Sequence, residues 1–173
     1  MSQEYILWIA TSAYAVHMIE ETMYDWHSWV RRVLKLDAEW NEFYLVNAFV
    51  IVLGISCAMI GWRQPAAALI FPAFMLVNAI LFHILPTLVT RVFSPGLFTA
   101  VVLFVPIGGW AYYGAWRDGV LSTGAVIISG VVGFLLMMFP IVLQKTKRLP
   151  FFSQSGTADL PYRPAMAARA VRS

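Results

Sequence analysis

The sequence has little charge, a single cysteine and few histidines. Only 12% of its 173 residues are Asp, Glu, Lys or Arg, against roughly 25% in soluble domains, whereas 60% are hydrophobic. This composition excludes an ordinary soluble globule, and a net charge of +3 is no sign of nucleic-acid binding. Cys57 has no partner for an intrachain disulfide. Three histidines are too few for the histidine-box desaturases and hydroxylases, so that class is excluded as well.

Several familiar catalytic motifs are also missing. The chain contains no H-E-x-x-H of the zincin proteases, no G-x-S-x-G nucleophile elbow, no phosphate-binding P-loop and no dinucleotide fingerprint. A function must therefore be inferred from individual polar residues and from where the topology places them.

Long hydrophobic runs are what the sequence has in abundance. Five of them are long enough to cross a bilayer, which takes ~20 residues, and they cover residues 5–24, 43–62, 66–89, 97–116 and 120–143. The runs are continuous rather than alternating, which favours helices over a β-barrel. We predict an all-α fold, a polytopic membrane bundle of about five transmembrane helices, as one domain over residues 1–144. Residues 145–173 form a basic, Pro- and Ala-rich tail.

The connecting segments differ in charge. Residues 25–37 combine tryptophans and basic side chains at helical spacing, which predicts a short amphipathic helix at the membrane interface, although an ordinary loop fits equally well. Basic residues gather on one side of the predicted bundle, in 25–37, near Arg91 and in 145–148, whereas the other side has only Arg63 and Arg117. The positive-inside rule then places the C-terminus in the cytoplasm.

One predicted span contains three ionisable side chains within five residues. His17, Glu20 and Glu21 lie at positions i, i+3 and i+4 of a helix, so we expect them to share a face and to project within ~6 Å along its axis. Burying charge in hydrocarbon costs several kcal/mol unless the group is paired, protonated or bound to a metal. The run is therefore a candidate functional site. An interhelical hydrogen-bond network that serves packing alone is the simpler alternative.

Antiparallel topology brings more polar residues to the depth of this run. The start of the second predicted span and the end of the third lie on the same side of the membrane as the end of the first. We therefore predict a polar pocket between three helices, on the cytoplasmic side. The residues that join the run in this pocket are Tyr14, Glu42, Asn47, Asn78 and His83.

Imidazoles and carboxylates in this pattern form a ligand set for zinc, iron or manganese. Helix bundles with carboxylate-bridged metals use related Glu-x-x-His pairs from facing helices. We predict His17, Glu20, Glu21 and His83 as metal ligands, with Glu42 as a further ligand or base. A bound divalent cation would offset the cost of burying the carboxylates.

Three functions fit such a site. The first is a metal-dependent membrane enzyme acting on a lipid-like, hydrophobic small molecule. The second is a metal-free acid–base isomerase or cyclase of an isoprenoid or sterol-like lipid, in which one glutamate is the acid and another stays ionised. The third is a non-catalytic subunit of a larger membrane complex, and a homo-oligomer is also open. Membrane lipids are the expected partners, with no nucleic acid. The predicted roles are catalytic for Glu20, Glu21 and Glu42 and pocket-lining for Tyr14, Asn47 and Asn78.

His17-Met18-Ile19-Glu20-Glu21 resembles the defining motif of the HXXEE-domain family of bacterial integral membrane proteins. That family's pattern also includes a further histidine, which His83 resembles, and a Y-x-P-G motif. Phe93-Ser94-Pro95-Gly96 is similar to the latter, with Phe93 in place of the tyrosine and so without its hydroxyl. The resemblance covers roughly residues 5–143 and implies a helical bundle in a bacterial inner membrane. It implies no activity, because the family's function is uncharacterised.

Overall fold

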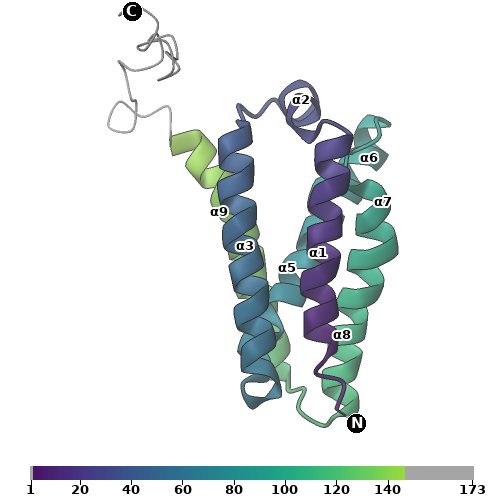
Figure 1. Ribbon diagram of the computed structural model, residues 1–173, viewed down its shortest axis with the longest axis vertical. Helices are drawn as coiled ribbons and strands as arrows, with labels where there is room; N and C mark the ends of the chain where they lie inside the picture. Colours follow the sequence, from purple (N-terminus) through teal and green to yellow (C-terminus); the bar gives the residue numbers. More distant parts are fainter. Residues whose placement is uncertain (1, 147–173) are drawn as a thin grey trace, which may run out of the picture.

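The computed structural model describes residues 2–146, with side chains as far as Val142. Within these residues the chain is helical with no strand, and its long helices run up and down along one direction (Figure 1). The predicted all-α bundle is therefore confirmed. The predicted tail, residues 145–173, lies outside the described residues except for the last turn of the final helix.

Four helical stretches are long and apolar enough to cross a membrane: Trp40–Arg63, Pro65–Thr90, Leu97–Arg117 and Thr123–Val142. They correspond to the second to fifth predicted spans. The elements that compose the described chain are α1 (Ile6–Met23), α2 (Trp26–Trp29), the π-helical η1 (Val30–Leu34), α3 (Trp40–Ile60), the 3-10 turn η2 (Gly61–Arg63), α4 (Pro65–Ala68), α5 (Ile70–Asn78), the π-helical η3 (Ala79–Ile84), α6 (Leu85–Thr90), α7 (Leu97–Thr99), the π-helical η4 (Ala100–Phe104), α8 (Val105–Arg117) and α9 (Thr123–Thr146).

The first predicted span, residues 5–24, differs from the other four. It forms α1, which lies in the bundle against α3 and α8 but is not apolar enough to count as a span by itself. His17, Glu20 and Glu21 lower its hydropathy, and all three are buried. The polar part of α1 is thus covered by the neighbouring helices rather than by lipid.

Proline explains where two of the membrane-length helices change pitch. Because proline has no N–H, the carbonyl four residues before it loses its helical partner. Pro86 follows the π-helical η3, and Pro106 follows the π-helical η4. Wide π turns of this kind often occur at functional sites because they reorient a side chain. The turn before Pro86 carries His83.

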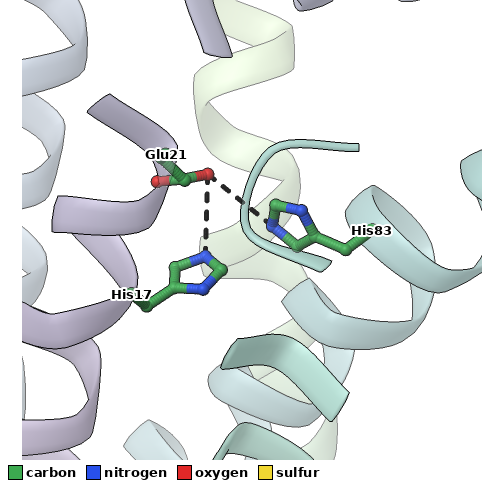
Figure 2. A group of neighbouring side chains, drawn as sticks. All are labelled: His17, Glu21 and His83. Carbon is green, nitrogen blue, oxygen red and sulfur yellow. Dashed lines mark ion pairs between the residues drawn. The ribbon is translucent and has the colours of Figure 1, made fainter. Parts of the chain in front are cut away.

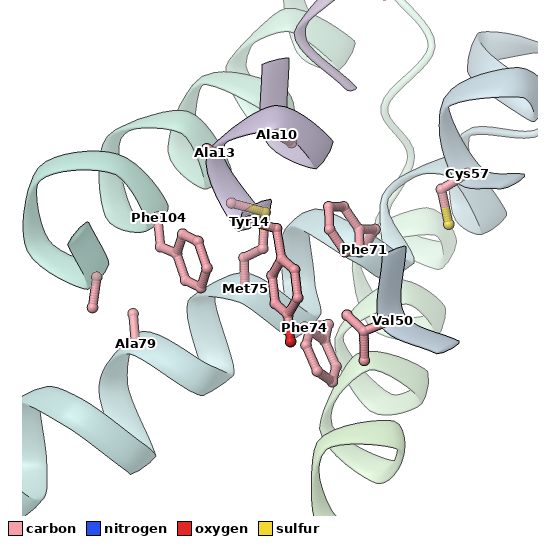
Figure 3. Packing of buried hydrophobic residues seen from close by; sticks show 11 residues of the cluster. Ala10, Ala13, Tyr14, Val50, Cys57, Phe71, Phe74, Met75, Ala79 and Phe104 are labelled. Carbon is pink, nitrogen blue, oxygen red and sulfur yellow. The ribbon is translucent and has the colours of Figure 1, made fainter. Parts of the chain in front are cut away.

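Aromatic packing fixes the rotation of α1 about its axis. The Tyr14 ring stacks on Phe104 with ring centroids 5.7 Å apart, and it packs edge-on against Phe71 at the same distance (Figure 3). Ala10 and Ala13, on the same face, are small enough for α1 to approach its neighbours closely. His17 lies one turn beyond Tyr14 and is therefore directed into the bundle, towards η3 and α7.

The segment predicted as an amphipathic helix or a loop is helical, in α2 and η1. It begins directly after α1 and covers the end of the bundle where α6 and α7 also lie (Figure 1). Trp29 and Val30 are buried against Ala38, so this short helical segment has its own small apolar core. The site described below lies at this end of the bundle.

The opposite end is tied together by Asp118. Its Oδ2 accepts hydrogen bonds from the Gln3 backbone N–H at 2.6 Å, the Ser2 hydroxyl at 2.8 Å and the Trp62 indole N–H at 2.9 Å. The bond from Gln3, followed by those from the two side chains, lowers the pKa of the Asp118 carboxyl from its usual value. This network, which the sequence did not predict, joins the N-terminus, the turn after α3 and the turn after α8.

Candidate metal centre

The candidate site lies where the second half of α1 meets η3 and the turn that precedes α7. His17 and Glu21 come from successive turns of α1, and His83 comes from η3. Their side chains converge in the interior of the bundle (Figure 2). All three are buried, with exposed fractions of 1% for His17, 5% for Glu21 and 0% for His83. The structure thus brings together three of the four predicted ligands.

The three side chains meet at one carboxylate oxygen. Oε1 of Glu21 lies 3.6 Å from Nε2 of His17 and 3.6 Å from Nε2 of His83. The two imidazole rings are nearly perpendicular, with centroids 4.8 Å apart. Two ligands each about 2.1 Å from a tetrahedral ion lie about 3.4 Å apart, close to the observed separations. The group could hold a metal ion, since its three ligand atoms all lie within 4.8 Å of one another.

The hydrogen bonds around His17 determine which of its nitrogens carries the proton. Oγ1 of Thr99 lies 2.5 Å from Oε2 of Glu20, 3.3 Å from the Gly96 carbonyl oxygen and 2.7 Å from Nδ1 of His17. With Glu20 as an ionised carboxylate neither of the two oxygens can donate, so the single hydroxyl proton goes to one of them. Thr99 therefore accepts from Nδ1–H of His17, and Nε2 keeps its lone pair.

The proton of His83 is placed in the same way. Nδ1 of His83 lies 3.1 Å from Oγ of Ser94, and this hydroxyl in turn lies 3.2 Å from the Phe82 carbonyl oxygen and 3.4 Å from that of Pro95. Both carbonyls can only accept, and with the Ser94 proton donated to one of them, Nδ1–H of His83 donates to Ser94. Nε2 of His83 is again the atom with the lone pair.

The Phe82 carbonyl, which accepts from Ser94, lies four residues before Pro86. In a regular α-helix this carbonyl would accept the backbone N–H of residue 86, which proline lacks. The carbonyl accepts from the Ser94 hydroxyl, which in turn contacts the ring of His83.

Two imidazole lone pairs therefore face one carboxylate oxygen. Within the described residues, Nε2 of His17 and Nε2 of His83 are buried and have no hydrogen-bond partner. Buried polar atoms are normally paired, because leaving one unpaired costs about 1–3 kcal/mol. Three electron-rich atoms that converge without a donor between them form a group that could hold a cation.

Glu20 is placed differently from the sequence prediction of a metal ligand. Its carboxylate accepts the backbone N–H groups of Phe98 at 3.1 Å and of Thr99 at 2.7 Å, in addition to the Thr99 hydroxyl. These amides belong to the first turn of the helix Leu97–Arg117, where backbone N–H groups have no helical partner and carboxylates are favoured. The charge of Glu20 is compensated there, outside the three-residue group.

Geometry explains why the two glutamates separate. Successive residues of an α-helix differ by about 100° around the axis, so Glu20 and Glu21 lie on either side of His17. Glu20 faces the start of α7, and Glu21 faces His83. The expectation that all three side chains of the run meet at one point therefore holds only for His17 and Glu21.

A deeper polar pair is formed by two residues predicted to line a pocket. The Tyr14 hydroxyl donates to Oδ1 of Asn47 at 2.6 Å, and Nδ2 of Asn47 donates to the Phe43 carbonyl at 2.8 Å. The Tyr14 ring centroid lies 6.1 Å from that of His17. This pair links α1 to α3 one turn away from the candidate metal centre.

The structure places two further predicted residues outside the three-residue group. Glu42 lies in the first turn of α3, where its side chain accepts the Glu39 backbone N–H at 3.4 Å in a capping box. Asn78 donates from Nδ2 to the Met137 sulfur at 3.6 Å, and its buried Oδ1 has no partner among the described residues. Neither belongs to the group formed by His17, Glu21 and His83.

Gly96 packs directly on both histidine rings. A Cβ atom at this position would lie 2.6 Å from Cε1 of His83 and 2.7 Å from Cε1 of His17. Its φ of +94° is also one that residues with side chains rarely adopt. The sequence pointed to Gly96 only through the Pro-Gly motif, and Ser94 and Thr99 were not predicted as hydrogen-bond partners. The sequence signal that could have identified Ser94 and Thr99 is their position next to the turn that begins the predicted span 97–116.

The family model for proteins of unknown function with an HXXEE motif matches residues 8–111, more than half of the chain. The chain belongs to the HXXEE family. An uncharacterised protein of Bacillus subtilis (strain 168), YrkK, is similar to it, with 27% identity over 142 residues that cover 76% of this chain and 89% of that protein. No solved structure matches the chain significantly.

The structure shows what each of the three fixed residues of the HXXEE motif contacts. The histidine and the second glutamate, His17 and Glu21, belong to the group that can hold a metal ion. The first glutamate, Glu20, binds the first turn of the helix Leu97–Arg117. In this HXXEE protein the motif therefore contacts two neighbours of α1, namely η3 and the start of the helix Leu97–Arg117.

Proposed function

We propose that this HXXEE protein is a membrane-embedded metalloenzyme whose divalent metal is held by His17, Glu21 and His83. The observation that carries the proposal is the pair of buried Nε2 atoms, both without a hydrogen-bond partner and both 3.6 Å from one Glu21 oxygen. The hydrogen bonds of Thr99 and Ser94 to the Nδ1 atoms support this role, because metal-binding histidines usually donate their other ring N–H to such partners.

Zinc, iron and manganese are the metals that suit two imidazoles and one carboxylate. Three protein ligands leave coordination positions open, which is typical of catalytic rather than structural sites. A metal bound in this way acts as a Lewis acid or activates a water molecule. The residues of the chain hold the ligand set rigid, since Thr99, Ser94 and Gly96 restrain both rings.

A lipid-like, hydrophobic molecule is the proposed substrate class. Large apolar side chains are exposed along all four membrane-length helices, so the surroundings of the site are hydrocarbon rather than water. We place the protein in a bacterial inner membrane, with the site and the C-terminus on the cytoplasmic side. This orientation rests on the basic residues near the site's end of the bundle, among them Arg31, Arg32 and Arg91.

The test is metal content and thermal stability of the full chain purified in detergent. Wild-type protein should retain about one divalent ion, and His17→Ala, Glu21→Gln and His83→Ala should each lose it. Readdition of the metal at about 100 times its Kd should stabilise wild-type protein by about 2.7 kcal/mol and leave these variants unchanged. His27→Ala is the matched control, because His27 lies in α2 outside the group and should bind metal as wild type does.

Wild-type protein that binds none of the three metals, and whose melting temperature does not respond to them, would refute the metal centre. Conversion of membrane lipids that survives a strong chelator would instead support metal-free acid–base catalysis. Loss of conversion on chelation and recovery with one metal would support the metalloenzyme.

A further inference from the structure

We propose that Glu20 is a positioning residue which, through Thr99, fixes His17 in the tautomer that presents a lone pair to the metal. The inference rests on the proposed metal centre and deepens it. It assigns the first glutamate of the motif a role that neither the ligand prediction nor the family description contains.

The first step is the anchoring of Glu20. Its two carboxylate oxygens accept the backbone N–H groups of Phe98 and Thr99, which are fixed by the start of the helix Leu97–Arg117. Two N–H donors hold the group as an acceptor, and at 8% exposure little water can compete for it.

The second step is the direction of the Thr99 hydroxyl. It lies 2.5 Å from Oε2 of Glu20, the short distance expected when a hydroxyl donates to a carboxylate. Because its single proton points to Glu20, its lone pairs point away and one of them faces Nδ1 of His17 at 2.7 Å. Nδ1 must then carry the proton, and Nε2 must not.

The third step is the consequence for the metal. Neutral imidazole binds a metal through the nitrogen without a proton, and Nε2 of His17 is the nitrogen that faces Glu21 and His83. The opposite tautomer would place a hydrogen in the middle of the ligand group. Glu20 therefore acts on the metal two hydrogen bonds away, without touching it.

Replacing Thr99 separates the hydroxyl from the packing. Thr99→Val keeps the size of the side chain but removes the hydroxyl, so we expect about 10–100-fold weaker metal affinity and a mixed tautomer of His17. Thr99→Ser keeps the hydroxyl and should restore both properties. Thr22→Val is the matched control, because the hydroxyl of the exposed Thr22 donates to the Met18 carbonyl of its own helix, away from the site.

The tautomer is read from nitrogen magnetic-resonance spectra of metal-free protein labelled with 15N-histidine, in a His27→Ala background that leaves only the two site histidines. Metal affinity is measured by competition with a chelator of known affinity for zinc. In Glu20→Gln one carboxylate oxygen becomes an NH2 donor, so the side chain can no longer accept from Phe98 and Thr99 together. Where the NH2 faces Thr99, the hydroxyl turns towards Nδ1, Nε2 of His17 is protonated, and we expect zinc binding to weaken.

The outcomes distinguish the two proposals. Native tautomer and native zinc affinity in Thr99→Val overturn the positioning role, as does a Thr99→Ser variant as impaired as Thr99→Val, because packing would then carry the effect. If wild-type protein binds no zinc, iron or manganese, the metal centre fails. The His17 tautomer of the metal-free protein still tests the hydrogen-bond chain by itself.

Discussion

Replacing Gly96 by alanine should damage the candidate metal centre, although it adds only one methyl group. The added Cβ would lie 2.6 Å from Cε1 of His83, 2.7 Å from Cε1 of His17 and 3.0 Å from Nδ1 of His83. These distances are shorter than carbon atoms tolerate, and hydrogen bonds to Thr99 and Ser94 restrain both rings. Displacement of either ring strains these bonds.

Two contributions set the magnitude of the effect. Forcing a residue with a side chain into the left-handed region, here φ +94°, costs about 1–2 kcal/mol. Crowding a packed interior by one methyl group costs typically about 1–3 kcal/mol more. We therefore expect Gly96→Ala to lose about 2–5 kcal/mol of stability. Displacement of the rings should also weaken metal binding by about 10–100-fold.

Gly119→Ala separates these two contributions. Gly119 also has a positive φ, +74°, but a Cβ atom there would meet no other atom within 4 Å. This variant should therefore show the backbone strain alone, about 1–2 kcal/mol, with metal affinity unchanged.

The assay is thermal unfolding in detergent of metal-free and zinc-loaded protein, together with zinc affinity by chelator competition, for both glycine variants. If Gly96→Ala and Gly119→Ala lose equal stability and bind zinc equally well, the turn before α7 does not press on the histidines and the prediction is wrong.

Two further predictions concern hydrogen-bond acceptors at the two ends of the bundle. Because the pKa of Asp118 is lowered, its bonds stabilise the fold above about pH 4 and are lost as the pH falls through the lowered pKa. Asp118→Asn should therefore melt below wild type at neutral pH, and the gap should close in melting curves below about pH 4. Pro86→Ala offers an N–H to the Phe82 carbonyl, so Ser94 should lose the nearer of its two carbonyl acceptors and zinc affinity should fall; unchanged affinity would contradict this coupling.

Much of the fold could be predicted from the apolar runs. The predicted span 66–89 differs from Pro65–Thr90 by only one residue at each end. The agreement is this close because the lipid-facing and the buried side of a membrane helix are both apolar. The π-helical stretches were not predictable from hydropathy. They depend on which carbonyl a proline leaves free and on what donates to that carbonyl, which is a matter of tertiary contacts.

The candidate site was predictable only where one helix or simple topology determines it. The spacing of His17 and Glu21 places them one turn apart, and antiparallel spans bring His83 to the same depth. The hydrogen-bond partners of the Nδ1 atoms of the two histidines were not predictable in this way. Thr99 and Ser94 are short hydroxyl side chains near the ends of apolar runs, where sequence alone does not show which histidine they reach.

The spacing of the HXXEE motif follows from these contacts. A residue four positions after the histidine returns to its side of the helix and can face the same point, as Glu21 does. A residue three positions after it is displaced by about 100° from the fourth, far enough to reach a different neighbour, as Glu20 reaches the first turn of the helix Leu97–Arg117. Thr99 then links Glu20 to His17, because its hydroxyl contacts both residues. Two adjacent glutamates therefore contact two different neighbours of α1, and exchanging their contacts would require a different packing of α1.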